Sequence, residues 1–206
     1  MKVAVLSESP ADELAVRILA QAVVPHVIEP VDILPLRTRG WPSVLDVVPV
    51  VIKQLHYHTL ADGLIVVVDS NDSPVHTATH ESVGGANAHC RFCQLRAVTS
   101  STMQYLRPIS GRSTLRYAVG TAVPAIEAWY LSGLNPQASE AGFLGGALVH
   151  DRRELKRLVY GTDRPGLSLE MNRAAMEAQR LAAGIHDLEI SFPGGFGRLA
   201  VALRGW

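Results

Sequence analysis

The sequence predicts an α/β protein built on a mostly parallel central sheet with helices on both faces. The strongest indication is Leu64-Ile-Val-Val-Val68, a run of five branched apolar residues bounded by turn residues. A strand that is covered on both faces forms such a continuous run, because neither face favours polar side chains. The second indication is the alternation of strand and helix patterns over roughly the first 70 residues, which favours right-handed crossovers between parallel strands.

The composition is that of a globular protein. Apolar residues make up 48% of the 206 residues, and 19 basic residues balance 19 acidic ones, so the overall charge gives no nucleic-acid signature. The N-terminal apolar run is too short for a signal peptide, and no stretch reaches the roughly 18 apolar residues of a membrane span. We therefore expect a cytoplasmic protein without membrane association. Residues 1–206 should form one domain, with an inserted segment at 74–96 and a helical part at 148–206.

The N-terminal elements begin the alternating pattern. Lys2–Leu6 is predicted to be a strand, and the helix after it opens at Pro10 with Ser9 as its N-cap. Proline is favoured at the first helical position because its missing N–H would have no partner there. Residues 27–36 can form a second strand, although two prolines interrupt it.

The middle of the chain continues this pattern. Its apolar spacing predicts a helix that starts near Pro49, because a proline inside a helix breaks the hydrogen-bond ladder. The central strand follows, and after it comes an irregular stretch rich in His and Gly. A helix over residues 88–106 and a buried strand over residues 116–123 complete this part.

Helix start and stop signals mark the C-terminal part. Pro124 opens a helix that Gly133 ends, and residues 151–160 form a basic helix closed by the glycine that follows. Ser168 is predicted to cap a longer helix that runs to residue 183. A glycine-rich loop at residues 194–197 and a short helix end the chain.

Oxygen-bearing side chains follow three of the predicted strands. Glu8 follows the first strand, Asp69 ends the central one, and Glu127 lies in the first turn of the helix that Pro124 opens. Because parallel strands end at one edge of the sheet, where α/β folds bind ligands, these acids should gather there. Crowded carboxylates raise one another's pKa, so the arrangement favours a hard cation such as Mg²⁺ or Mn²⁺. The candidate ligands are Glu8, Asp12, Asp69, Asn71 and Asp72, with Glu127 beside them.

Each of these residues also has a purely structural explanation. Residues 69–74 have the composition of a good turn, because Asp, Asn and Ser side chains bond their own backbone. Asp12 and Glu127 could complement helix N-termini, an effect of about 0.3–1 kcal/mol each. The arrival of acids from three strand ends at one edge favours the metal-site interpretation over these separate explanations.

The acidic segments resemble the motifs of TOPRIM domains. Val5-Leu-Ser-Glu8-Ser-Pro-Ala-Asp12 is similar to their first motif, in the Glu-x-x-x-Glu/Asp version of OLD-type nucleases, and Ile65-Val-Val-Val-Asp69-Ser-Asn71-Asp72 looks like their strand followed by Asp-x-Asp. The resemblance extends over roughly residues 3–160. A bacterial TOPRIM-like family of undetermined function has segments similar to the Arg37-Thr-Arg-Gly40 loop, to Cys90-Arg-Phe-Cys93 and to Ala122-Val-Pro-Ala-Ile-Glu127-Ala-Trp129.

The resemblance implies a TOPRIM/Rossmann-like fold and metal-dependent phosphodiester chemistry. It implies metals held by the acids after the first and central strands, with Glu8 or Glu127 as general base on water. Nucleases of this kind often act with an ATPase, so it also suggests an ATPase partner. Two positions depart from the pattern: Ser9 stands where glycine usually follows the first glutamate, and Asn71 stands where the second Asp is expected.

The basic helix at residues 151–160 is the candidate phosphate-binding element, through Arg152, Arg153 and Lys156. A solvated amphipathic face explains the same charges.

A second group of residues has the composition of a zinc site. The only two cysteines, Cys90 and Cys93, are three residues apart, and His76, His80 and His89 precede them. Two thiolates and two imidazoles are a common tetrahedral zinc set, which could hold a long irregular loop. A redox pair is a poorer interpretation, since no strand directly precedes the cysteines. Two reduced cysteines with solvated histidines would explain the pattern without any metal.

Two functional hypotheses follow. The first is a Mg²⁺-dependent TOPRIM-like nuclease or phosphoryl-transfer enzyme acting on nucleic acid, with an ATPase partner in a bacterial defence system. The second is a non-catalytic TOPRIM-like protein-interaction module with a structural zinc site. The chain lacks the P-loop, dinucleotide-binding and nucleophile-elbow motifs, so it lacks the usual residues for NTP hydrolysis, dinucleotide binding and α/β-hydrolase chemistry.

Overall fold

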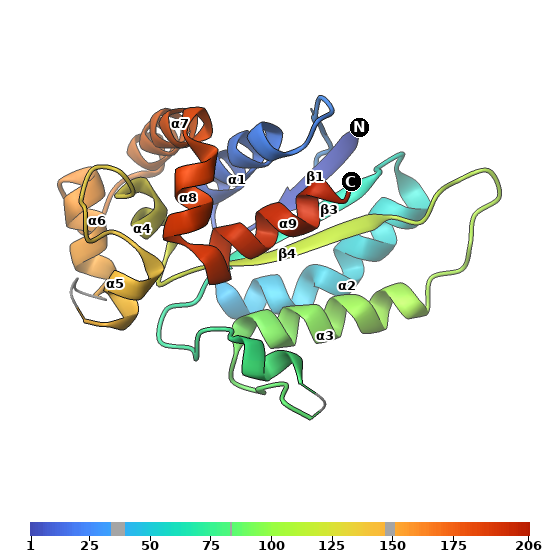
Figure 1. Ribbon diagram of the computed structural model, residues 1–206. Helices are drawn as coiled ribbons and strands as arrows, with labels where there is room; N and C mark the ends of the chain where they lie inside the picture. Colours follow the sequence, from blue (N-terminus) through green and yellow to red (C-terminus); the bar gives the residue numbers. More distant parts are fainter. Residues whose placement is uncertain (34–39, 83, 147–150) are drawn as a thin grey trace.

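A computed structural model describes residues 1–33, 40–82, 84–146 and 151–206, and it shows an α/β fold (Figure 1). Its sheet has four strands in the order β2-β1-β3-β4, and every neighbouring pair is parallel. The predicted α/β class with a parallel sheet is therefore confirmed for the described residues. The strands are β1 (Lys2–Leu6), β2 (Glu29–Pro30), β3 (Gly63–Asp69) and β4 (Arg116–Ala122).

β3 occupies the interior position that its unbroken apolar run predicts. All seven of its residues are buried, and it pairs with β1 on one side and β4 on the other. Its side chains alternate between two cores. Ile65 and Val67 face one core, and Leu64, Val66 and Val68 face the other.

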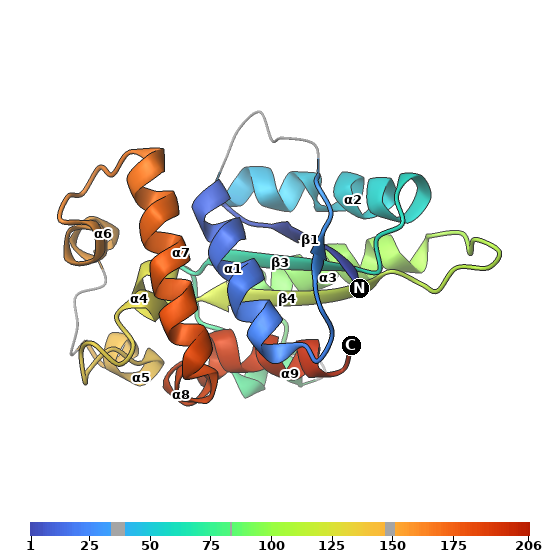
Figure 2. The same cartoon turned by 90° about the horizontal axis from the view of Figure 1, so that it is seen from above.

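Helices cover both faces of the sheet, as Figures 1 and 2 show. One face packs against α1 (Pro10–Val23) and α9 (Arg198–Arg204), with α7 (Leu167–Ala183) packed on α1, and the other face packs against α2 (Trp41–His58) and α3 (Arg91–Gln104). Beyond the C-terminal ends of the strands, α4, α5 and α6 extend the molecule on one side (Figure 1). The remaining elements are η1 (Ala78–Glu81), α4 (Ile126–Tyr130), α5 (Glu140–Leu144), α6 (Arg152–Tyr160), α8 (Ile185–Ser191) and the π-helical turn η2 (Pro193–Gly197).

Several predicted elements lie where the sequence places them. β1 and β4 match within one residue, and α3 falls inside the predicted range 88–106. Ser9 caps α1 by accepting a hydrogen bond from the Asp12 N–H at 3.1 Å. α6 begins after its cap Asp151 and ends at Gly161, whose φ of 75° is the left-handed conformation that favours glycine.

The second strand is much shorter than predicted. Of residues 27–36, only Glu29–Pro30 pair with β1, and residues 34–36 lie outside the described residues. β2 is at the sheet edge, where a proline without an N–H can be accommodated but cannot donate to a further strand. The prediction of a long strand was therefore wrong for residues 31–33, where Val31 N–H makes one last bond to Val3 O.

The starts of three helices also differ from the prediction. α2 begins at Trp41 and carries Pro49 inside it, because Val44 and Val48 continue the buried stripe formed by Val51 and Ile52. Burial of four large side chains offsets the roughly 3 kcal/mol that an internal proline costs. α7 begins one residue before Ser168, with Gly166 as its N-cap, and α4 runs only from Ile126 to Tyr130.

Two short helices, α5 and α8, were not predicted, and residues 194–197 belong to η2 instead of a loop. α5 and α8 have five and seven residues, too few for an apolar period to stand out. No helix among the described residues combines the length and the apolar character that crossing a bilayer requires.

Candidate functional site

Four buried acidic side chains meet at the C-terminal edge of the sheet, and we call them the rim cluster: Glu8, Asp12, Asp69 and Glu127. Glu8 follows β1, Asp69 ends β3, and Glu127 lies in α4 just after β4; none is more than 9% exposed. Asp69 joins the three strand ends. Its N–H donates to Glu8 Oε1 at 3.1 Å, and its Oδ1 accepts from the Ile126 N–H at 3.0 Å.

Three basic side chains lie among these four acids. Arg91 comes from the start of α3, and Arg152 and Lys156 come from α6. The pairs are Arg152 Nη2 to Asp69 Oδ2 (3.3 Å), Arg91 Nη1 to Glu8 Oε1 (3.4 Å) and Lys156 Nζ to Glu127 Oε1 (3.9 Å). These distances are long for charge-assisted hydrogen bonds, which are typically about 2.7–2.9 Å. The acids are only partly neutralised, because Lys156 Nζ lies closer to Glu170 Oε1, at 2.9 Å, than to Glu127.

Burial raises the pKa of every member of the rim cluster, and repulsion between the acids raises the pKa of three of them further. Burial is the largest cause throughout; repulsion from Asp69 adds to it for Glu8, Asp12 and Glu127. The pKa of Asp12 lies well above its ordinary value, and that of Glu127 rises to about 7. Glu127 Oε2 is buried and has no hydrogen-bond partner among the described residues. Glu127 can therefore exchange a proton near neutral pH, and an arriving cation would favour the ionised form of all four acids.

An open cleft of about 570 Å³ lies beside the rim cluster and has polar walls. Its lining residues are Asn71, Asp72, Arg91, Asp151 and Arg152. Asn71 adopts φ 45°, a conformation that Asn tolerates better than most residues, and its N–H donates to Pro124 O at 2.7 Å. The cleft thus offers both carboxylate and guanidinium groups to solvent. That mixture suits a ligand that carries phosphate together with a cation.

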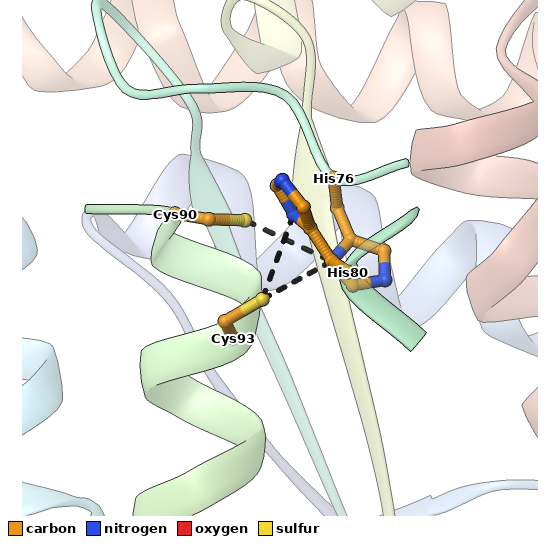
Figure 3. Close-up of side chains that lie close together, drawn as sticks. All are labelled: His76, His80, Cys90 and Cys93. Atoms are coloured by element: carbon orange, nitrogen blue, oxygen red, sulfur yellow. Dashed lines mark hydrogen bonds between the residues drawn. The ribbon is translucent and has the colours of Figure 1, made fainter. Parts of the chain in front are cut away.

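A separate group of soft ligands, which we call the His/Cys cluster, lies at the start of α3. It consists of His76, His80, Cys90 and Cys93, and one ligand atom of each lies within 4.8 Å of those of the others. Figure 3 shows the two imidazoles facing the two sulfur atoms. Cys93 Sγ lies 3.4 Å from His76 Nδ1 and 3.7 Å from His80 Nδ1, and Cys90 Sγ lies 3.8 Å from His76 Nδ1.

The spacing of these atoms matches a tetrahedral zinc site. Zn–S bonds of about 2.3 Å and Zn–N bonds of about 2.05 Å at a tetrahedral angle place sulfur and nitrogen about 3.6 Å apart. Three of the four sulfur–nitrogen distances lie within about 0.2 Å of that value. The predicted pair of cysteines with two histidines therefore could bind a metal such as zinc.

No protein-family model, curated protein or solved structure matches this chain.

Most of the predicted site residues lie in one of the two clusters or in the cleft. Three do not. His89 is exposed and outside the His/Cys cluster, so of the three candidate histidines only His76 and His80 are in place to bind the metal. Asp72 is exposed and lines the cleft without joining the buried acids. Arg153 is exposed, and no acidic group of the described residues lies within ion-pair distance of it.

Two residues that the sequence did not single out connect the clusters to their surroundings. Arg91 donates to Asp69 O at 2.9 Å and stacks on the Trp41 ring at 5.1 Å, but its position between the cysteines drew attention only to the thiols. Glu81 accepts from His76 Nε2 at 2.7 Å. An acid five residues after a candidate metal-binding histidine is a signal that could have identified it, because such histidines usually bond a carboxylate through their other nitrogen.

Proposed function

We propose that this chain is a Mg²⁺- or Mn²⁺-dependent phosphodiester hydrolase or phosphoryl-transfer enzyme that acts on nucleic acid, with the rim cluster as its site. The observation that carries the proposal is the meeting of four buried carboxylates from β1, α1, β3 and α4 beside an open cleft with arginines in its wall. A fold does not gain stability from crowding acids whose pKa values burial and repulsion both raise. Such crowding is understandable where a cation and a phosphate bind.

Glu8 and Asp69 are the residues best placed to hold the cation, with Asn71 and Asp72 toward the cleft and Asp12 behind. Their donors are oxygens, which a hard divalent ion prefers, but among the described residues only the His/Cys cluster already brings three or more ligand atoms together, so an ion at the rim would have to draw these acids closer. A bound ion would polarise a phosphoryl oxygen and lower the pKa of a bound water. Arg91 and Arg152 face the same cleft and are suited to orient the phosphate.

Glu127 is the residue that we assign as general base. A base works best with a pKa near the operating pH, and the pKa of Glu127 is raised to about 7 by burial and by Asp69. Its Oε2 has no hydrogen-bond partner among the described residues, so it is available to accept a proton. Lys156, 3.9 Å from the other oxygen, stabilises the ionised form.

The TOPRIM resemblance is part of this proposal. It supports phosphodiester chemistry through the positions of Glu8, Asp69 and Glu127, and it suggests an ATPase partner in a bacterial defence system. Asn71 carries an amide where the resemblance expects a carboxylate, so Asp72, one residue further and exposed, would have to supply the charge on that side.

Melting curves with Mg²⁺ and Mn²⁺ test the site directly. We expect each cation at millimolar concentration to raise the Tm of the wild-type protein, and Asp69→Asn to remove the rise while keeping the side-chain shape. Asp46→Asn, an exposed acid in α2, is the matched control and should leave the rise intact. Cleavage of single-stranded DNA, duplex DNA and RNA should follow the same pattern. A wild-type Tm that neither cation moves would exclude the metal site.

One observation favours the non-catalytic alternative. Three of the four rim acids lie beside a basic side chain, so the cluster already contains partial neutralisation. In a protein-interaction module with a structural zinc, these contacts would be permanent ion pairs. That hypothesis predicts a cation-insensitive Tm, no cleavage of any nucleic acid and a lower Tm for Asp69→Asn without added metal.

A further inference from the structure

The His/Cys cluster lies where the loop after β3 returns to the sheet edge. His76 comes from this loop, His80 from η1, and the cysteines from the beginning of α3 (Figure 3). We propose that the cluster binds one Zn²⁺, and that this ion fixes the start of α3, so that Arg91 is held against the rim cluster. Zinc content and its effect on α3 do not depend on the proposed function, because the two clusters share no residue.

Burial distinguishes a metal site from a reactive dithiol. Cys90 is 1% exposed and Cys93 is 7% exposed, whereas reactive thiols need access to solvent and a lowered pKa. Both imidazoles direct Nδ1 toward sulfur atoms, at distances beyond ordinary hydrogen bonds to oxygen but close to those of ligands around one zinc ion.

The surroundings of His76 are those of a metal-binding histidine. Nδ1 faces the sulfurs, and Nε2 lies 2.7 Å from Glu81 Oε1, which fixes the tautomer with the proton on Nε2. Arg198, the first residue of α9, donates to the same Oε1 at 2.8 Å, and Arg96 of α3 donates to Oε2. Glu81 therefore connects the cluster to α3 through Arg96 and to the C-terminal helix through Arg198.

The ion would act on the rim through Arg91. This residue lies between the two cysteines, at the first position of α3, and it donates to Asp69 O and pairs with Glu8. The N-cap Cys90 makes no side-chain capping bond, so the free N–H groups of the first turn have no side-chain cap. A metal bond to Cys90 and another to Cys93 would hold both ends of that turn. Without them, the first turn should fray and Arg91 should lose its fixed position.

Metal analysis and cobalt spectroscopy test the binding. Protein purified without chelators should contain about one zinc per chain. After exchange, Co²⁺ should give the visible bands of a tetrahedral site with thiolate-to-cobalt charge transfer. Cys93→Ser and His80→Asn should lose the zinc, and His89→Asn is the matched control that should keep it. Asp69→Asn should also retain full zinc, which separates this outcome from failure of the proposed function.

Hydrogen exchange tests the role in α3. Removing zinc from the wild-type protein should accelerate exchange at the amides of residues 76–96 at least tenfold, and leave α1 and α7 unchanged. Re-adding Zn²⁺ should restore protection. A wild-type protein that contains no zinc and gives an octahedral cobalt spectrum would overturn the metal site. Equal exchange with and without bound zinc would overturn its role in positioning α3, and neither result requires a folded variant.

Discussion

The rim cluster and the His/Cys cluster differ in how complete they are. In the His/Cys cluster, the ligand atoms of four residues already lie within 4.8 Å of one another, and Glu81 fixes the orientation of His76. In the rim cluster, hard oxygen ligands repel one another, their cationic neighbours lie 3.3–3.9 Å away, and one carboxylate oxygen has no partner among the described residues. A closed site of the first kind favours a structural role, and an incomplete one beside a cleft favours ligand binding.

Asp69→Ala is the substitution with the largest expected effect. It removes the carboxylate that connects β3 to α4 and the ligand at the centre of the rim, so we expect a loss of cleavage of about 10³-fold or more, or about 4 kcal/mol in transition-state stabilisation. Cys93→Ser in the other cluster should cost activity far less. Rates for both variants, measured at saturating Mn²⁺, check this contrast. Equal losses would show that the clusters act as one unit.

The sequence predicted the parts of these two clusters that follow from the apolar pattern of the strands. The run at residues 64–68 predicted a central strand, and parallel strands brought Glu8 and Asp69 to the same edge without any knowledge of side-chain contacts. The partners of these acids could not be predicted. Arg91 and Arg152 come from α3 and α6, whose positions relative to the sheet depend on packing and not on local pattern.

Local signals failed where tertiary packing was stronger. Pro49 predicted a helix start, but the buried stripe of α2 continues through it. The spacing of three histidines before the cysteines did not distinguish His89 from the other two, because the path of the irregular loop determines which of them faces inward. The sequence thus predicted which types of ligand form the zinc site, but not which of the histidines belong to it.

Loss of zinc should have the next largest effect. Chelation removes a cross-link that holds residues 76–93, and we expect the free energy of unfolding to fall by about 2–3 kcal/mol, a decrease of about 5–10 °C in Tm for a chain of this size. Calorimetry on zinc-loaded and zinc-free wild-type protein measures it, with His89→Asn as the control. Mg²⁺ or Mn²⁺ should not restore the lost Tm, because hard cations do not replace zinc among thiolates. If Mn²⁺ restored the Tm of the zinc-free protein, the assignment of zinc to the His/Cys cluster and of hard cations to the rim cluster would be wrong.

Glu127→Gln should change stability in a pH-dependent way. Burial and Asp69 raise the pKa of Glu127 to about 7 in the folded protein, above its ordinary value of 4.5. Between these values the folded state binds more protons, so the stability of the wild-type protein falls as pH rises from about 4.5 to 7. The neutral amide avoids this loss, which corresponds to about 3 kcal/mol at most.

We therefore expect Glu127→Gln to melt at a higher temperature than wild type at pH 8, with little difference at pH 4.5, and to lose cleavage at both. Melting curves over this pH range measure the effect without added metal. A variant that is less stable at pH 8 would mean that Lys156 and Glu127 form a stabilising ion pair, as the non-catalytic alternative requires.

Arg152→Ala should have the smallest effect, and Arg153 offers a matched control one position away on the same helix. Arg152 lines the cleft and lies 3.3 Å from Asp69, whereas Arg153 is exposed without an ion-pair partner among the described residues. Since the side chain of Arg152 is 45% exposed, solvent screens the pair, and we expect nucleic-acid affinity to fall roughly tenfold, about 1.4 kcal/mol. Arg153→Ala should change this affinity less than about twofold.

Binding to single-stranded DNA at two salt concentrations measures both variants, because loss of a phosphate contact lowers the salt dependence of affinity. Equal losses for the two variants would mean that α6 attracts nucleic acid through its overall charge and that the cleft does not position the phosphate.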